Sequence, residues 1–163
     1  MSFGASKTIR FLRYNGRSLS SQNMITLARI IFTHFLQLED VKGVDHSFES
    51  VYDKLISPQS VVVLAVNNQS IIGYVIAEPT LYDMQNLLHI YYIYVIPSFR
   101  NKGVATRLLK MVENYAHWIG INRISLTYDT YNDNLTKFYR DNHFDFDDTI
   151  RSFQRYDMLV KHV

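Results

Sequence analysis

Hydrophobic positions along the chain change their spacing several times, and each spacing predicts a particular element. Residues 8–13 alternate between polar and apolar side chains, which predicts a β-strand. Apolar residues then recur at helical spacing in residues 20 to about 38, and again in residues 47–56, just before Pro58. Because both segments begin with serine, a preferred N-cap residue, we expect two helices in this part of the chain.

The middle of the chain is rich in β-branched residues. The runs 61–66 and 70–77 flank the polar residues 67–69, and this pattern predicts a β-hairpin. We expect Pro79 to end the second arm of the hairpin, because proline cannot donate to a strand ladder. An apolar and aromatic run, residues 87–96, predicts another strand.

The last third of the chain alternates helix and strand signals. A helix is expected from about Gly103 to Gly120, where glycine is a typical C-cap. A strand at 123–128 and a helix at 132–142 follow, and 144–146 and 153–160 are expected to be closing strands. The order β-α-α-β-β-β-α-β-α-β-β predicts an α/β fold of the α+β kind, with helices on both faces of a mixed sheet.

Size and composition fit one globular domain spanning residues 1–163. Of the residues, 47% are hydrophobic and 20% are charged, which is typical of a soluble globular protein and not of a disordered chain. The formal net charge of +2 and the absence of a basic block argue against a nucleic-acid partner. Since the sequence has no cysteine, disulfides, thiol nucleophiles and cysteine metal sites are excluded.

Targeting and metal-binding signals are not evident either. The N-terminal residues lack the apolar core of a signal peptide, and no apolar run is long enough to span a membrane. We therefore expect a cytoplasmic protein without a membrane partner. None of the six histidines stands at metal-ligand spacing with another ligand-type residue, so no metal is expected.

The strongest functional signal is the turn that follows the strand at 87–96. The strand ends at Pro97, a polar turn carries Arg100 and Lys102, and Gly103 begins a helix. Such a helix start presents backbone N–H groups without partners, and these groups together with the helix dipole favour a bound anion. The two basic side chains add mobile positive charge. These features predict a phosphorylated ligand.

The turn also matches a family motif. Arg100-Asn101-Lys102-Gly103-Val104-Ala105 resembles the pattern (Arg/Gln)-x-x-Gly-x-(Gly/Ala), with Val95 and Pro97 at the usual hydrophobic and proline positions upstream. A second segment, Asn132-x-x-Leu135-x-x-Phe138-Tyr139 followed by Phe144, is similar to Asn-x-x-Ala-x-x-Phe-Tyr-x-x-x-Gly-Phe. Both patterns are characteristic of the GNAT superfamily of acetyl-CoA-dependent N-acetyltransferases.

The chain therefore resembles this superfamily over nearly its whole length in element order. The resemblance implies a mostly antiparallel sheet of about seven strands. It departs from the family at Leu135, where alanine is usual, and at His143, where glycine is usual. The first change affects packing. The second removes the residue that most easily forms a left-handed C-cap, so the exit of the last helix is in question.

The resemblance implies that acetyl-CoA is the cosubstrate and that no metal takes part. It places the diphosphate on backbone N–H groups of the turn, where the missing side chain of Gly103 allows close approach. It also implies that the pantetheine arm pairs with residues 91–95 and that the Ile93 N–H donates to the thioester carbonyl. The cofactor-binding residues implied are Ile93, Val95, Arg100, Asn101, Lys102, Gly103, Val104, Ala105, Thr106, Asn132 and Tyr139.

The resemblance implies three catalytic residues. Tyr139 matches the family tyrosine near the cofactor sulfur and is expected to act as the acid for the leaving thiolate. His89 and Tyr91 fall at strand positions where other members carry a base. Residues 89, 91 and 93 share one strand face if no bulge intervenes. The alternatives are a structural histidine, core tyrosines, and deprotonation through a chain of waters.

The acceptor is less well defined. Acidic residues in the regions that shape it are expected to attract a cation: Glu39, Asp40, Asp45, Glu49, Glu78, Asp83, Asp145, Asp147 and Asp148. We expect direct attack by a primary amine in a ternary complex, with a small polyamine-like molecule preferred. The alternatives are a protein N-terminal or lysine acetyltransferase, and a non-catalytic acyl-CoA-binding module. An ATP site would need a Gly-Lys-Ser/Thr loop, which is absent. Dimers are common in this family, which makes a homodimer a further expectation.

Overall fold

A computed structural model of the protein describes residues 8–15, 18–36, 46–82, 84–129, 132–146 and 156–163. Its elements, in chain order, are β1 (Arg10–Asn15), α1 (Ser21–His34), α2 (Phe48–Ile56), β2 (Val61–Asn67), β3 (Ser70–Tyr82), β4 (Gln85–Val95), the 3-10 turn η2 (Pro97–Phe99), α3 (Val104–Ile119), β5 (Arg123–Asp129), α4 (Asp133–Asp141) and β6 (Tyr156–His162). No helix among these residues is long and apolar enough to cross a membrane.

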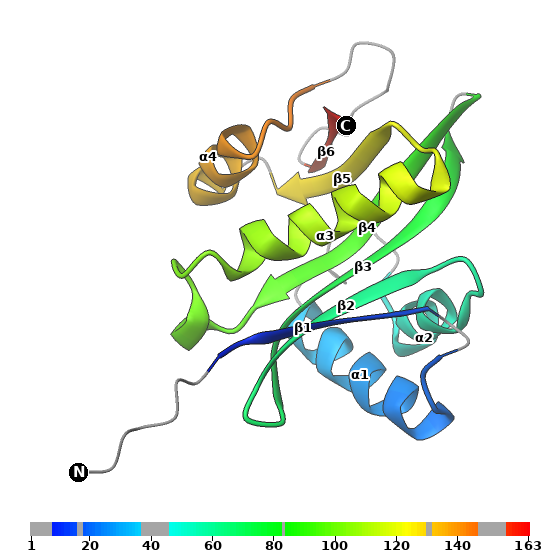
Figure 1. The fold of residues 1–163 in the computed structure, drawn as a ribbon, viewed down its shortest axis with the longest axis vertical. Coiled ribbons are helices and arrows are strands. Elements are labelled where there is room, and N and C mark those ends of the chain that lie inside the picture. Colours follow the sequence, from blue (N-terminus) through cyan, green and yellow to red (C-terminus); the bar gives the residue numbers. More distant parts are fainter. Residues whose placement is uncertain (1–7, 16–17, 37–45, 83, 130–131, 147–155) are drawn as a thin grey trace.

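The strands form one sheet in the order β1-β2-β3-β4-β5-β6. All neighbouring pairs are antiparallel except β4 and β5, which are parallel. Helices α1 and α2 pack on one face of the sheet, and α3 and α4 pack on the other (Figure 1). The expected α/β class, with a mixed sheet between two layers of helices, is confirmed.

The helix ends follow from local hydrogen bonding. The side chain of Ser20 accepts the Asn23 N–H at the start of α1, and Ser47 accepts the Ser50 N–H at the start of α2. Gly120 ends α3 with φ of 78°, the left-handed conformation that glycine adopts without strain. Helix α1 ends at His34, and the last residues of the segment expected to be helical, 37 and 38, lie outside the described residues.

Two expectations about strands are wrong. Strand β3 does not end at Pro79 but continues to Tyr82, with Pro79 opposite Leu88 of β4. The pairing of β2 with β3 ends at Ala77, so beyond that residue β3 has one neighbour, and an edge tolerates proline. Residues 144–146 form only an isolated bridge, between Asp145 and Val160. The described residues therefore contain six strands, not about seven, and residues 153–155 of the last predicted strand are not described.

A β-bulge in β4 changes which side chains share a face. Ile76 pairs with Tyr92 and the next residue, Ala77, pairs with Ile90, so Tyr91 is an extra residue in β4. As a result, Tyr91 packs with the core under α1 and α2, whereas Ile93 packs with the core under α3. The expectation that residues 89, 91 and 93 share a face fails for Ile93.

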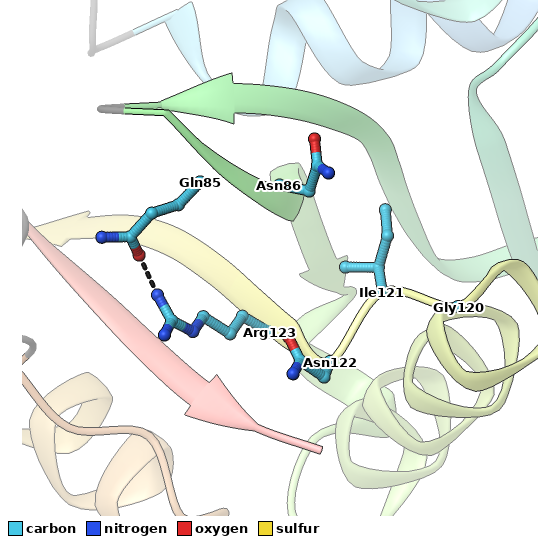
Figure 2. A pocket seen from close by; sticks show the side chains of 6 residues that line it. All are labelled: Gln85, Asn86, Gly120, Ile121, Asn122 and Arg123. Carbon is cyan, nitrogen blue, oxygen red and sulfur yellow. Dashed lines mark hydrogen bonds between the residues drawn. The ribbon is translucent and has the colours of Figure 1, made fainter.

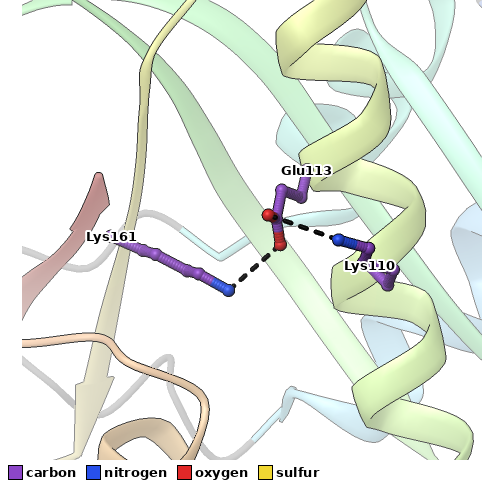
Figure 3. Close-up of polar contacts among 3 residues, drawn as sticks. All are labelled: Lys110, Glu113 and Lys161. Atoms are coloured by element: carbon purple, nitrogen blue, oxygen red, sulfur yellow. Dashed lines mark hydrogen bonds and ion pairs between the residues drawn. The ribbon is translucent and has the colours of Figure 1, made fainter. Parts of the chain in front are cut away.

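A half-buried charge network fastens the edge strand β6 to α3. Glu113 of α3 accepts from Lys161 of β6 at 3.0 Å and from Lys110 at 3.5 Å (Figure 3). Burial alone raises the pKa of the Glu113 carboxyl, but the hydrogen bond and charge of Lys161, assisted by Lys110, outweigh it and lower the pKa. Glu113 therefore remains ionised and paired at neutral pH, which fixes the sheet edge against the helix.

Candidate functional site

Strands β4 and β5 separate halfway along their length. They pair only at Leu88–Ile124, His89–Ser125 and Ile90–Leu126, and then diverge toward the start of α3 (Figure 1). Just beyond β4, the Ile96 N–H donates to Ile72 on the β3 side at 2.9 Å. Because N–H directions alternate along a strand, the N–H groups of Ile93 and Val95 point to the β5 side, where no strand pairs with them.

The turn that leads into α3 carries a series of free donors. The N–H group of Phe99 donates to the Ile96 carbonyl, and that of Arg100 donates to the Pro97 carbonyl. The next N–H group with an acceptor is that of Arg107, which donates to the Gly103 carbonyl at 3.1 Å. The six N–H groups from Asn101 to Thr106 have no acceptor in the described part of the chain. Asn101 and Gly103 both have left-handed φ, 60° and 78°, and left-handed residues are typical of the backbone concavities that bind anions. This turn has the properties of an anion site.

Two exposed cationic side chains lie beside this turn and contact neighbouring groups. The Arg100 Nε donates to the Val95 carbonyl at 2.8 Å, and its guanidinium lies 5.2 Å from the centre of the Tyr94 ring. The Lys102 ammonium lies 5.1 Å from the centre of the Phe99 ring. The positive charge of these side chains lies near the free N–H groups, which further favours an anion.

Tyr139 lies on α4 in an aromatic cluster. Its ring makes edge contacts with Tyr128, Phe138 and Phe144, and only 5% of the residue is exposed. The hydroxyl forms no hydrogen bond with the described residues. Burial raises the pKa of the Tyr139 hydroxyl well above its ordinary value near 10, so the group is protonated at neutral pH.

The two positions at which this chain departs from the family pattern are accommodated locally. Leu135 packs at the margin of the core under α3. His143 adopts the left-handed conformation expected of glycine, with φ of 68°. The Phe144 N–H then donates to the backbone carbonyl of Tyr139 at 2.9 Å, and this hydrogen bond forms a Schellman-type helix end. The C-cap that seemed in question is therefore formed, with backbone strain at His143.

Asn132 is committed to helix capping. Its Oδ1 accepts the Leu135 N–H at 3.1 Å at the start of α4, and its backbone carbonyl accepts the Thr136 N–H. The side chain lies at the end of α4 closest in sequence to β5, and its NH₂ group forms no hydrogen bond with the described residues. Only this amide donor is free to contact a ligand.

His89 lies on the last stretch of β4 that pairs with β5. Its Nδ1 is hydrogen-bonded to the Ser125 hydroxyl at 2.8 Å, and its ring makes an edge contact with Tyr91. Burial, reinforced by the nearby charge of Lys54, lowers the pKa of His89 to about 4. At neutral pH His89 is therefore an uncharged imidazole.

Tyr91 projects from the bulge toward α2. Its hydroxyl is 3.5 Å from the Thr80 hydroxyl, and the Lys54 ammonium lies 4.7 Å from the centre of its ring. Ser125 and Lys54 were missed from the sequence. Ser125 could have been noticed as a single polar residue between Ile124 and Leu126, but Lys54 has no such signal.

Most of the acidic residues expected to attract the acceptor lie outside the described residues: Glu39, Asp40, Asp45, Asp83, Asp147 and Asp148. Glu49 and Asp145 are exposed. Glu78, directly opposite His89 in the β3–β4 register, accepts a hydrogen bond from the Ser57 hydroxyl at 2.5 Å. Glu78 is thus a direct cross-strand neighbour of His89, one of the catalytic candidates.

A separate hollow of about 300 Å³ lies at the other end of β4 and α3. It is lined by Gln85, Asn86, Gly120, Ile121, Asn122 and Arg123, and the side chains of Gln85 and Arg123 are hydrogen-bonded across it (Figure 2). None of the predicted site residues lines this hollow. Within the described ranges, no group of three or more histidine or acidic side chains is arranged to hold a metal ion.

Comparison with known proteins identifies the family. Residues 27–144 match the family model described as acetyltransferase (GNAT) family, a segment that contains both the α3 turn and α4. The chain belongs to the GNAT acetyltransferase family. No curated protein matches this GNAT chain in sequence.

Solved GNAT structures share the fold of the whole chain. The PaiA N-acetyltransferase of Thermoplasma acidophilum, in complex with coenzyme A, has 15% identity and a TM-score of 0.70, with 96% of this chain and 99% of that chain covered. Arabidopsis thaliana NAA60 in complex with acetyl-CoA has 20% identity and a TM-score of 0.68, with coverage of 94% and 96%. An aminoglycoside acetyltransferase from an uncultured soil metagenomic sample has 14% identity and a TM-score of 0.66, with coverage of 91% and 95%.

Proposed function

We propose that this GNAT protein transfers the acetyl group of acetyl-CoA to a primary amine of a small, polyamine-like molecule, by direct attack in a ternary complex. The observation that carries this proposal is the row of six free N–H groups at the start of α3, beside the unpaired edge of β4. Two of the similar structures, PaiA and NAA60, contain coenzyme A or acetyl-CoA.

In this proposal the free donors of the turn hold the diphosphate. Backbone N–H groups bind phosphate well because they are fixed in place and because the helix dipole adds to their charge. A Cβ at Gly103 would have no protein atom within 4 Å, so the space in front of the turn is open to a ligand. Arg100 and Lys102 would contribute positive charge beside the turn.

The pantetheine arm would pair with β4 as an added strand. The N–H groups of Ile93 and Val95 point to the side of β4 where β5 no longer pairs, so both could donate hydrogen bonds to the arm. A donor from Ile93 to the thioester carbonyl would stabilise the oxyanion formed during attack, an effect worth about 3 kcal/mol in other enzymes. Asn132 would contact the arm through its amide NH₂ group.

Tyr139 would assist departure of the thiolate. Its raised pKa keeps the proton on the hydroxyl, so the group is a hydrogen-bond donor throughout the neutral range. A thiolate is a weaker base than this phenolate, because thiol pKa values lie near about 8.5. We therefore propose that Tyr139 stabilises the thiolate by a hydrogen bond while retaining its own proton for most of the step.

His89 and Tyr91 are the proposed groups on the acceptor side. With a pKa of about 4, His89 cannot deprotonate an alkyl ammonium of pKa about 10 directly, because the transfer is uphill by about 8 kcal/mol. We propose that the amine reaches the site already neutral. When Nδ1–H of His89 donates to Ser125, Nε2 is left as a hydrogen-bond acceptor that would orient the attacking amine, and the proton released after attack would leave through water.

Glu78 is directly opposite His89 in the β3–β4 register, so its negative charge would attract a cationic acceptor to this place. A protein N-terminus or lysine is the second candidate, since one of the similar structures is a NatC complex bound to a Gag peptide and coenzyme A (15% identity, TM-score 0.72). This likeness concerns the fold and leaves the acceptor of the present chain to experiment.

The test is an acetylation assay on the purified protein that detects the released thiol of CoA. The panel contains polyamines, an aminoglycoside, and peptides with a free N-terminus or an internal lysine. We expect turnover above acetyl-CoA hydrolysis with at least one amine, and the highest kcat/KM with a polyamine. No turnover with any amine would refute the proposed activity, and preference for a peptide would refute the polyamine assignment.

A further inference from the structure

Lys54 stands out among the charged residues near the proposed acceptor site. It is half-buried in the last turn of α2, and its ammonium lies 4.7 Å from the centre of the Tyr91 ring. Its one hydrogen bond is long, 3.4 Å to the Ser50 carbonyl of its own helix. No carboxylate of the described residues forms an ion pair with it. Within the described residues, the charge of Lys54 is therefore not neutralised by an ion pair.

The groups around Lys54 come from three elements. Strand β4 presents His89 and Tyr91, and strand β3 presents Glu78, which instead holds the Ser57 hydroxyl. On α2 itself the neighbouring Asp53 is exposed to solvent. The uncompensated cation thus faces the two residues that the proposed function assigns to the acceptor side.

The charge of Lys54 already acts on one titratable group. After burial, it is the second cause of the lowered pKa of His89. A positive charge disfavours any other positive charge nearby, whether on an imidazolium or on an alkyl ammonium. An acceptor amine placed beside His89 would be subject to the same repulsion.

We propose that Lys54 is an electrostatic positioning residue that keeps the acceptor amine unprotonated when it is bound beside His89 and Tyr91. This inference rests on the proposed function. An ammonium has no lone pair and cannot attack the thioester, so a bound ammonium is an unproductive complex. Lys54 makes that complex less stable, the proton passes to solvent, and the neutral amine remains to form the new C–N bond.

The variant Lys54→Met tests this directly, with Lys54→Arg as the matched control that retains the charge. Removing the cation allows ammonium to bind unproductively, so kcat and KM should fall together at pH 7 while kcat/KM changes little. The acid limb of the kcat–pH profile should move up by about one pH unit in Lys54→Met. At high pH, kcat should return to the wild-type value, and Lys54→Arg should follow the wild type throughout.

A second measurement does not depend on turnover. NMR titration of the His89 imidazole in the unliganded protein should show a higher pKa in Lys54→Met than in the wild type or in Lys54→Arg. In an active enzyme, an unchanged kcat profile or an unchanged His89 titration in Lys54→Met would overturn the inference while leaving the acetyltransferase proposal intact. A wild type that acetylates no amine would refute both, even if the His89 titration shifts.

Discussion

The anion-binding role of the α3 turn can be tested with two glycines of the same helix. Gly103 precedes α3 and Gly120 follows it, both have φ of 78°, and a Cβ at either position would meet no atom within 4 Å. We expect Gly103→Trp and Gly120→Trp to cost the same free energy of unfolding, about 1–2 kcal/mol, because the left-handed conformation is strained for any L side chain. For a domain of this size that lowers Tm by roughly 2–8 °C in each variant.

The two variants should differ in acetyl-CoA binding. A side chain at Gly103 extends into the space in front of the free N–H groups from Asn101 to Thr106, whereas one at Gly120 lies at the opposite helix end. A hydrogen bond to a charged group is worth about 1.5–3 kcal/mol, so losing two contacts to the diphosphate removes about 3–6 kcal/mol. This corresponds to an increase in Kd of at least roughly a hundredfold for Gly103→Trp.

The assay is isothermal titration calorimetry, supported by the change in Tm on adding acetyl-CoA. At a ligand concentration of about 100 times Kd, binding stabilises a protein by about 2.7 kcal/mol. We expect the corresponding rise in Tm in the wild type and in Gly120→Trp. After a hundredfold rise in Kd, the same concentration should stabilise Gly103→Trp by only about 0.4 kcal/mol. Equal affinity of the two tryptophan variants for acetyl-CoA would refute the assignment of the turn as the diphosphate site.

Three further variants test single residues. Tyr139→Phe should lower kcat at least about tenfold without weakening acetyl-CoA binding, and it should leave Tm unchanged because the hydroxyl forms no hydrogen bond with the described residues. Unchanged kcat would exclude the role of Tyr139. His89 has a pKa of about 4 in the folded state against 6.5 unfolded, so the unfolded chain binds more protons between these values and stability is lost as pH falls through this window. Urea titrations should show a loss of up to about 3 kcal/mol between pH 6.5 and pH 4, and His89→Gln should lose less. His143→Gly should stabilise the protein by about 1 kcal/mol in urea titrations, since His143 has φ of 68°, and an unchanged midpoint would show that the αL strain is relieved elsewhere.

The parts of the fold that could be predicted are those determined by neighbouring residues. Ser47 caps α2 and Gly120 ends α3 because each interacts with groups a few positions away. The glycine turn at Gly103, which precedes α3, could be predicted for the same reason. The continuation of β3 past Pro79 could not be predicted, because the effect of a proline depends on whether a second strand pairs alongside it, and this is a tertiary property.

The acceptor side could be predicted only in part. The pattern of apolar residues in β4 gives no sign of an extra residue at Tyr91, because the bulge is defined by the register with β3. The contacts of His89 with Ser125 and of Tyr91 with Lys54 join residues 36 or more positions apart. No local pattern encodes such contacts, so the electrostatic environment of His89 emerged only from the folded structure.

The bulge in β4 accounts for the separation of β4 from β5. Tyr91 is the extra residue of β4, and Ile90 is the last residue of β4 that pairs with β5. A bulge disrupts the ladder and increases the local twist, so regular pairing with β5 ends where the bulge begins. The same extra residue also reverses which side chains of β4 point to each face of the sheet. Tyr91 therefore packs on the face covered by α1 and α2, and Ile93 packs on the face covered by α3. Without the bulge, regular pairing of β4 with β5 could continue past Ile90 and occupy the N–H groups of Ile93 and Val95, which the proposed function assigns to the cosubstrate.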